Sequence, residues 1–228
     1  MTVLFLLGLI VWPALPWIIG GVGVTVAIIL WALWLFDEGP ITGKRIEVLG
    51  PQNSGKTTFL NFLRNKTVTG EATARERYEP FEYKLSNGKT VTIAGGEDIG
   101  GGDTFREDYV GKIKESDSII FIFDIHKYLN GHNKKDKTKD QYVRLTEARF
   151  KLVYDHFKDN YPGEIDPHRL VVIGSHRDKL KAGDNKIKGA FYDCIRKNEY
   201  KEMFKNFRIC DLTNKDELRK IVDSIFDY

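Results

Sequence analysis

The first part of the sequence lacks charge, because no Lys, Arg, Asp or Glu precedes Asp37 in this chain of 228 residues. Cysteine is scarce as well, and the two present, Cys194 and Cys210, show no metal-ligand spacing. So few thiols argue against a disulfide-stapled secreted fold and predict reduced, structural cysteines in a cytosolic domain. The net charge of +3 is mild, and we expect no nucleic-acid partner.

The uncharged stretch Val3–Phe36 exceeds the roughly 20 apolar residues that a helix needs to cross a bilayer. As one straight helix it would reach about 50 Å, which is too long. Prolines at positions 13 and 16, in WPALPW, divide it. We therefore predict one membrane span, Trp17–Phe36, with a short apolar arm before it. A hairpin that bends at the prolines is the alternative.

A cleaved signal peptide fits this stretch poorly, since no basic residue precedes it and no small-residue cleavage site follows. Lys44 and Arg45 place the downstream part on the cytoplasmic side by the positive-inside tendency. The predicted organisation is an anchor in the lipid bilayer through residues 3–36, a linker over 37–43 and a folded domain over 44–228.

Apolar and amphipathic runs alternate through the charged part of the chain. Strands are expected at 45–49, 81–85 and 90–94, the last two joined as a hairpin by the turn signal Asn87-Gly88. The strands expected at 118–125 and 170–173 are apolar, as in a sheet covered on both faces. Helices are expected over 57–65, 105–113, 142–157, 185–204 and 215–226. This alternation predicts an α/β fold with a doubly wound, mostly parallel sheet and one antiparallel edge pair.

One segment, Lys127–Gln141, interrupts this alternation with five lysines and two aspartates. Its composition predicts a solvated, mobile loop. A second interpretation is a docking site for a partner or for anionic lipid.

The stretch GPQNSGKTT, from Gly50 to Thr58, fits the phosphate-loop pattern G-x4-G-K-T between an expected strand and an expected helix. Its glycines let backbone N–H groups approach phosphate oxygens, and the following helix adds a partial positive charge. We expect Lys56 to reach the terminal phosphates and the Thr57 hydroxyl to bind Mg²⁺. The sequence therefore predicts a P-loop nucleotide site.

Two acidic residues downstream extend this prediction. Asp98 begins the pattern Asp98-x-x-Gly101 in EDIGGGD, where a carboxylate can hold Mg²⁺ through water and an N–H can meet a γ-phosphate. Asp178 ends SHRD after an apolar strand, and its carboxylate can accept two hydrogen bonds from guanine that adenine does not offer.

The order of these three motifs resembles the small GTPases of the Ras superfamily, and EDIGGG looks most like the Arf branch. A membrane span ahead of such a domain is similar to the family of signal-recognition-particle receptor beta subunits. The resemblance implies that GTP or GDP with Mg²⁺ is bound by Gly50, Asn53, Ser54, Gly55, Lys56, Thr57, Thr58, Asp98, Gly101, Ser175, His176, Asp178 and Leu212.

Three departures from the family pattern concern the base and the chemistry. Ser175 and His176 replace the usual Asn and Lys. Gly102 stands where many relatives carry the Gln that orients the attacking water, so we expect slow or partner-dependent hydrolysis. Several threonines can serve as the switch residue that reaches Mg²⁺, and Thr73 is favoured over those at positions 67 and 69.

Together these features predict a membrane-anchored GTPase switch on the cytoplasmic face, which recruits a protein partner in its GTP state. One alternative is a nucleotide-bound scaffold that does not hydrolyse. Another is a membrane-active effector whose apolar arm perturbs the bilayer under nucleotide control.

Overall fold

The computed structural model describes residues 41–66, 75–99, 106–133, 140–161, 163, 165 and 169–226. Residues 41–228 group as one compact unit. The predicted span, Trp17–Phe36, and the apolar arm before it lie outside the described residues. Within the described ranges, every helix is too short or too polar to cross a membrane.

A four-stranded parallel sheet forms the centre of the described unit. Its strands run in the order β2 (Ile46–Leu49), β7 (Ser118–Asp124), β8 (Leu170–Ser175) and β9 (Phe207–Ile209). Every residue of β2, β7 and β8 is buried, as expected for a parallel sheet that is covered on both faces. The α/β class and the parallel sheet predicted from the sequence are confirmed.

A long antiparallel hairpin lies beside this sheet. Its inner half pairs β4 (Phe81–Lys84) with β5 (Thr90–Ile93), and its outer half pairs β3 (Arg75–Tyr78) with β6 (Gly96–Ile99). The turn between β4 and β5 contains Asn87-Gly88, and Gly88 has φ +89°, so the predicted hairpin is confirmed.

The strand β1 (Ile41–Lys44) pairs in parallel with β5, and only Arg45 separates it from β2. The hairpin is therefore joined to the central sheet by the continuous segment 41–49. β1 begins inside the stretch that was expected to be linker, because pairing with β5 is a contact between segments about 50 residues apart.

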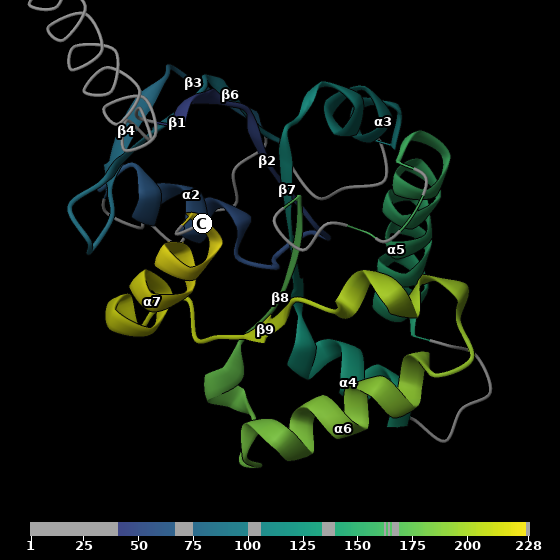
Figure 1. Cartoon of the computed structure of the whole chain (residues 1–228). Coiled ribbons are helices and arrows are strands. Elements are labelled where there is room, and N and C mark those ends of the chain that lie inside the picture. The colour runs from purple at the N-terminus through teal and green to yellow at the C-terminus, as the bar shows by residue number, and fades with distance from the viewer. Residues whose placement is uncertain are drawn as a thin grey trace, which may run out of the picture. The chain divides into compact units, whose positions relative to one another are not determined.

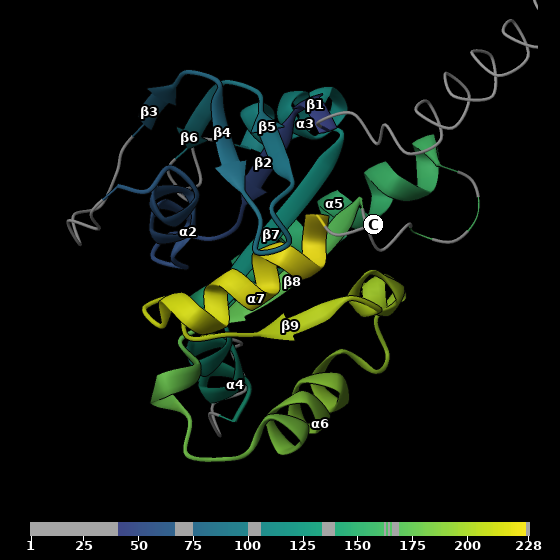
Figure 2. The ribbon, with the colours of Figure 1, turned by 60° about the vertical axis from the view of Figure 1, so that its left-hand side comes forward.

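Helices cover both faces of the central sheet (Figures 1 and 2). One face carries α2 (Lys56–Leu63) and α7 (Lys215–Phe226), which share a core with Ile120 and Ile122 of β7. The other face packs against α3 (Arg106–Glu115), α4 (Ile125–Asn133), α5 (Gln141–Asn160) and α6 (Asp184–Ile195). Alternate residues of β7 thus enter different cores, which is the doubly wound arrangement.

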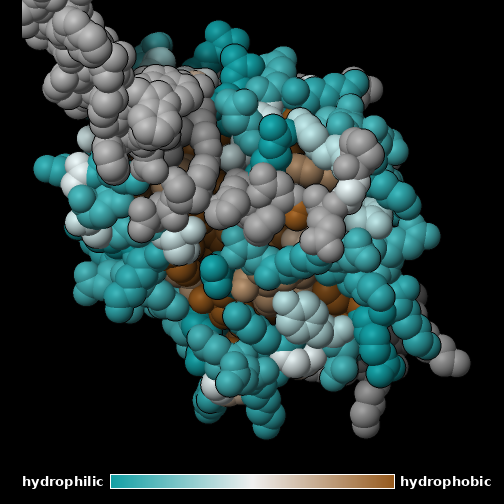
Figure 3. Space-filling view, viewed as in Figure 1, coloured by the Kyte–Doolittle hydropathy of each residue, from teal (hydrophilic) through white to brown (hydrophobic). Residues whose placement is uncertain are grey.

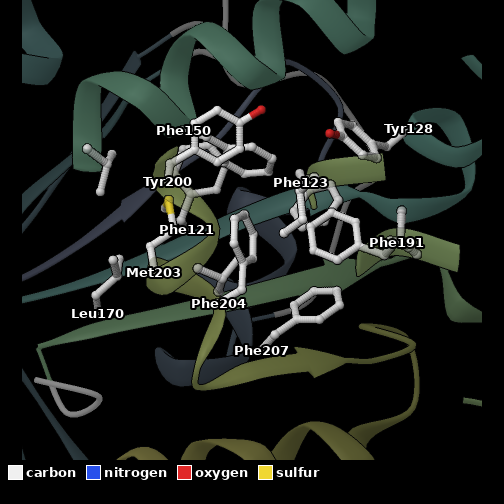
Figure 4. Close-up of a cluster of buried hydrophobic side chains, with 14 of the residues drawn as sticks. Phe121, Phe123, Tyr128, Phe150, Leu170, Phe191, Tyr200, Met203, Phe204 and Phe207 are labelled. Carbon is white, nitrogen blue, oxygen red and sulfur yellow. The ribbon is translucent and has the colours of Figure 1, made fainter. Parts of the chain in front are cut away.

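Aromatic side chains fill the larger core (Figure 4). The ring of Phe123, on β7, lies 5.2 Å from that of Phe150 on α5 and 5.4 Å from that of Phe191 on α6. Each fully buried phenylalanine contributes about 2–3 kcal/mol. This cluster holds α5 and α6 against the strand that ends at Asp124.

Two expectations about helices were wrong. The segment expected as a loop from Lys127 begins instead as the helix α4, with Tyr128 and Leu129 buried against the core. Its apolar residues follow the helical spacing from Ile125, and the lysines further along hid this pattern. The helix expected over 185–204 is broken after Ile195, and the 3-10 helix η3 (Glu199–Phe204) follows.

On the face shown in Figure 3, the described surface is mostly hydrophilic. Hydrophobic residues show only in a narrow band across the middle of this face.

Candidate functional site

The carboxyl ends of four parallel strands meet at one edge of the sheet. Asp124 at the end of β7 pairs with Ser175 at the end of β8, and Gly174 pairs with Ile209 of β9. Ligands of open α/β sheets bind at this edge. The loop after β2 and the segments after β7, β8 and β9 therefore form the candidate site.

The loop from Gly50 to Gly55 connects β2 to α2 and contains three residues with positive φ, at positions 50, 53 and 55. Gly50 has φ +149°, and a Cβ at this position would overlap the carbonyl oxygen of Ile122 on β7. Gly55 has φ +95°, and its Cβ would overlap the Cδ1 atom of Leu212. Two glycines thus let the backbone pack closely against its neighbours, which is the geometry of a loop that wraps an anion.

Lys56 is the first residue of α2, and only 5 % of its surface is exposed. Its Nζ donates a hydrogen bond to the carbonyl oxygen of Pro51 at 2.9 Å. The lysine therefore folds back over the loop and holds its charge beside the loop backbone.

The N-terminus of α2 adds positive potential to the same loop. Gly55, just before the helix, has no side chain to cap it, and the first turn carries no acidic residue. The dipole of the helix at this end favours an anion. Thr57 and Thr58 lie half-buried in this first turn.

Ser175 connects the loop to the sheet. Its buried Oγ lies 2.7 Å from the carbonyl oxygen of Ser54 in the loop and 3.0 Å from that of Phe123 on β7. A hydroxyl has one proton to donate, so the two carbonyls share it. The resemblance implied a role for Ser175 at the base, and in the structure its hydroxyl joins the loop at Ser54 to β7.

His176 turns toward the interior of the same edge. Its backbone is left-handed, with φ +59°, and its Nδ1 lies 2.9 Å from Ser175 Oγ and 3.5 Å from Asp124 Oδ2. Because Ser175 donates its proton to the carbonyls, its Oγ can accept a hydrogen bond from the Nδ1–H of His176. Burial lowers the pKa of His176, and the nearby Asp124 carboxylate acts in the opposite direction.

Asp124 and Lys127 belong to this edge but were not predicted as site residues. Asp124 is fully buried, and its Oδ1 accepts the Lys127 N–H at 2.9 Å. The Lys127 Nζ lies 3.8 Å from Asp124 Oδ2 and above the ring of Tyr142. The signal in the sequence was one acidic residue that closes an otherwise apolar strand.

Asp178 and Leu212 lie on the segments that follow β8 and β9. Asp178 is exposed in the 3-10 helix η2 (Arg177–Lys179). Leu212 is buried against Gly55, so the segment after β9 packs against the loop from Gly50 to Gly55. Asn214 then caps α7 by accepting backbone N–H groups with its Oδ1.

The remaining predicted residues are only partly described. Asp98 lies on β6, opposite Glu76 of β3, and β6 contacts β2 and α2. Thr73, Gly101 and Gly102 lie outside the described residues. The described structure therefore brings together the loop at 50–58, the segment 175–178 and Leu212.

The donor set of this site suits a phosphate. It consists of loop N–H groups, one ammonium group and two threonine hydroxyls, and the close backbone packing at Gly50 leaves no space for a larger residue there. Thr57 offers a hydroxyl oxygen of the kind that Mg²⁺ prefers. Among the described residues, no group of three His, Cys, Asp or Glu side chains gathers to hold a metal by itself.

Comparison of the sequence with protein-family models found no match, and comparison with curated proteins found none either.

Proposed function

We propose that this protein is a membrane-anchored GTP-binding switch of the small-GTPase kind, with a P-loop fold. The observation that carries the proposal is the loop from Gly50 to Lys56. It joins a buried strand to a helix at the carboxyl edge of a parallel sheet, with left-handed glycines and a lysine folded over its backbone. Such a loop binds the phosphates of a nucleotide.

The strand order supports the same fold. If the continuous segment 41–49 is taken as one strand, the order across the unit is β4, β5, β1 with β2, β7, β8 and β9. Only β4 runs antiparallel to its neighbour in this order. The phosphate-side loop then follows the central strand, where open α/β sheets bind their ligands.

In this proposal, each residue near the triphosphate has a specific role. Lys56 neutralises the terminal phosphates, and the loop N–H groups bind their oxygens. Thr57 would hold a Mg²⁺ ion, with Asp98 and Thr73 as further candidate ligands, and the ion would supply positive charge to neutralise the phosphates. The Gly101 N–H would meet the γ-phosphate, so that loss of this phosphate releases the segments around Thr73 and Asp98.

At the end of the site that would hold the base, the residues have roles that differ from those in the family pattern. Asp178 is exposed at the rim and available to pair with guanine. His176 and Ser175 are held by contacts with Asp124 and the loop, so their role is to position the loop and the rim. Guanine selectivity therefore depends chiefly on Asp178.

Nucleotide titration of the full chain in nanodiscs tests the proposal. We expect GTP and GDP to bind at micromolar concentrations or below, and ATP not to bind. The double substitution Lys56→Ala and Thr57→Ala should abolish this binding. Asp178→Asn should weaken the binding of GTP and should not strengthen the binding of its phosphates. Equal binding of ATP and GTP would overturn the guanine assignment, and unchanged binding by the double variant would overturn the site itself.

A second candidate is a scaffold that binds GTP and does not hydrolyse it. It is favoured by Gly102, which has no side chain to orient a water molecule. Single-turnover hydrolysis separates the two candidates. If Gly102→Gln raises a near-zero rate, the missing side chain limits a true GTPase, whereas a rate that stays at zero favours the scaffold.

A further inference from the structure

A second concave site lies away from the sheet edge, and we call it the basic hollow. It has a volume of about 520 Å³ and lies between the end of α2, the strand β4 and the start of α7. None of the residues assigned to nucleotide binding contributes to its lining, which consists of Phe62, Leu63, Asn65, Lys66, Glu82, Tyr83, Lys84, Lys215, Asp216 and Arg219.

Positive charge dominates the rim of the basic hollow. The lining holds two carboxylates and four cationic side chains, which are Lys66 after the end of α2, Lys84 on β4, and Lys215 and Arg219 on α7. All four are exposed, and Arg219 also interacts with the phenol of the buried Tyr83. Cations that the fold gathers around one concavity favour an anionic occupant.

The floor of the basic hollow is aromatic. Tyr83 is 93 % buried, since only 7 % of it is exposed, and its ring centroid lies 6.1 Å from that of the half-buried Phe62. Burial raises the pKa of the Tyr83 phenol, and the positive charge of Arg219 acts in the opposite direction. An occupant would therefore meet an apolar surface below and cations around it.

The basic hollow lies near the point where the chain enters the described unit. Tyr83 pairs with Val91 on β5, and Val91 pairs with Ile41 on β1, so the three residues form one row across the sheet. Two strand spacings, about 10 Å, separate the first residue of the row from the last. In the sequence, four residues (37–40) separate Ile41 from the predicted span.

We propose that the basic hollow binds the headgroup of an anionic phospholipid in the membrane that holds the N-terminal anchor. This rests on the anchor of the proposed function and is independent of the nucleotide. The cytoplasmic leaflet carries negative charge, which attracts basic residues next to a membrane anchor. The half-buried ring of Phe62 on the floor suits the boundary between headgroups and acyl chains.

Hydrogen exchange of the full chain in nanodiscs tests this proposal. Discs of phosphatidylcholine alone are compared with discs rich in phosphatidylserine. We expect slower backbone exchange at 62–66, 81–84 and 215–219 in the anionic discs, by about fivefold or more, since each basic side chain near an anionic surface contributes about fivefold. Exchange in α6, which is not part of the hollow, should not change.

Two matched variants separate the hollow from general surface charge. Lys84→Gln with Lys215→Gln removes two rim cations and should abolish most of the slowing. Lys186→Gln with Lys197→Gln removes two exposed lysines elsewhere on the unit and should leave it intact. Equal loss in both pairs would show that only the total charge matters and would overturn the proposal.

The remaining outcomes are equally decisive. If inorganic phosphate produces the same slowing in neutral discs, the occupant is a soluble anion and the lipid proposal fails. If GTP binds but no lipid slows exchange, the basic hollow is empty and the nucleotide site stands. If the chain does not enter the discs, both the anchor and the lipid proposal are overturned.

Discussion

The substitution Gly50→Ala tests whether the loop after β2 packs against the sheet as described. The added methyl group would overlap the carbonyl oxygen of Ile122 and lie 2.9 Å from its carbonyl carbon. Ile122 is fully buried in β7 and pairs with Ile173 of β8, so its backbone cannot move without disturbing the sheet. Overpacking of this kind costs about 1–3 kcal/mol, and strain at a positive φ adds about 1–3 kcal/mol.

Gly88→Ala is the matched control. Gly88 also has a positive φ, of +89°, but nothing lies within 4 Å of the position of its Cβ. Only the backbone strain applies there, at about 1–2 kcal/mol. For a unit of this size, each kcal/mol lowers Tm by about 2–4 °C. We therefore expect a loss of roughly 10 °C for Gly50→Ala and of a few degrees for Gly88→Ala.

Thermal unfolding of the full chain should be followed by far-UV circular dichroism. Tryptophan fluorescence would not report on this unit, because all four tryptophans lie within the first 36 residues. We also expect Gly50→Ala to lose GTP binding at temperatures where it is still folded, and Gly88→Ala to keep it. Equal melting temperatures for the two variants would refute the packing of the loop against β7.

Three further predictions concern single side chains. Ser175→Ala leaves two buried carbonyls without their shared proton, and we expect it to lower the free energy of unfolding by about 1–3 kcal/mol in denaturant titrations and to weaken GTP binding. Burial lowers the pKa of His176 and of His156, so their contribution to stability is present above about pH 6.5 and is lost as the pH falls through their lower folded values. His176→Gln should therefore flatten part of the acid limb of the stability profile, and an unchanged profile would contradict its burial beside the loop. Burial raises the pKa of the Cys210 thiol to about 12, so alkylation of the native chain should modify Cys194 first, as mass spectrometry would show, and equal rates would contradict this packing.

Local patterns in the sequence were enough to predict much of the fold. The apolar runs of β7 and β8, the Asn87-Gly88 turn and the loop at Gly50 each depend on residues that are close in sequence. Their periodicity and turn chemistry act over a few residues, so the elements can be predicted without knowing their partners. The resemblance implied that Leu212 lies at the base, and its position against Gly55 of the loop was not expected.

Contacts between distant segments could not be predicted in the same way. β1 becomes a strand because β5 lies beside it. The role of Ser175 depends on the Ser54 carbonyl, 121 residues away. Nothing in the neighbouring sequence encodes such a distance.

The sequence by itself determined that a loop with the pattern G-x4-G-K-T follows a buried strand and that an uncharged stretch precedes the folded unit, because both features consist of consecutive residues. Only the tertiary structure decided which side chains hold that loop, and that cations from α2, β4 and α7 meet around one hollow. Sheet pairing and helix packing bring these groups together, and this proximity cannot be predicted from the spacing of the residues along the chain.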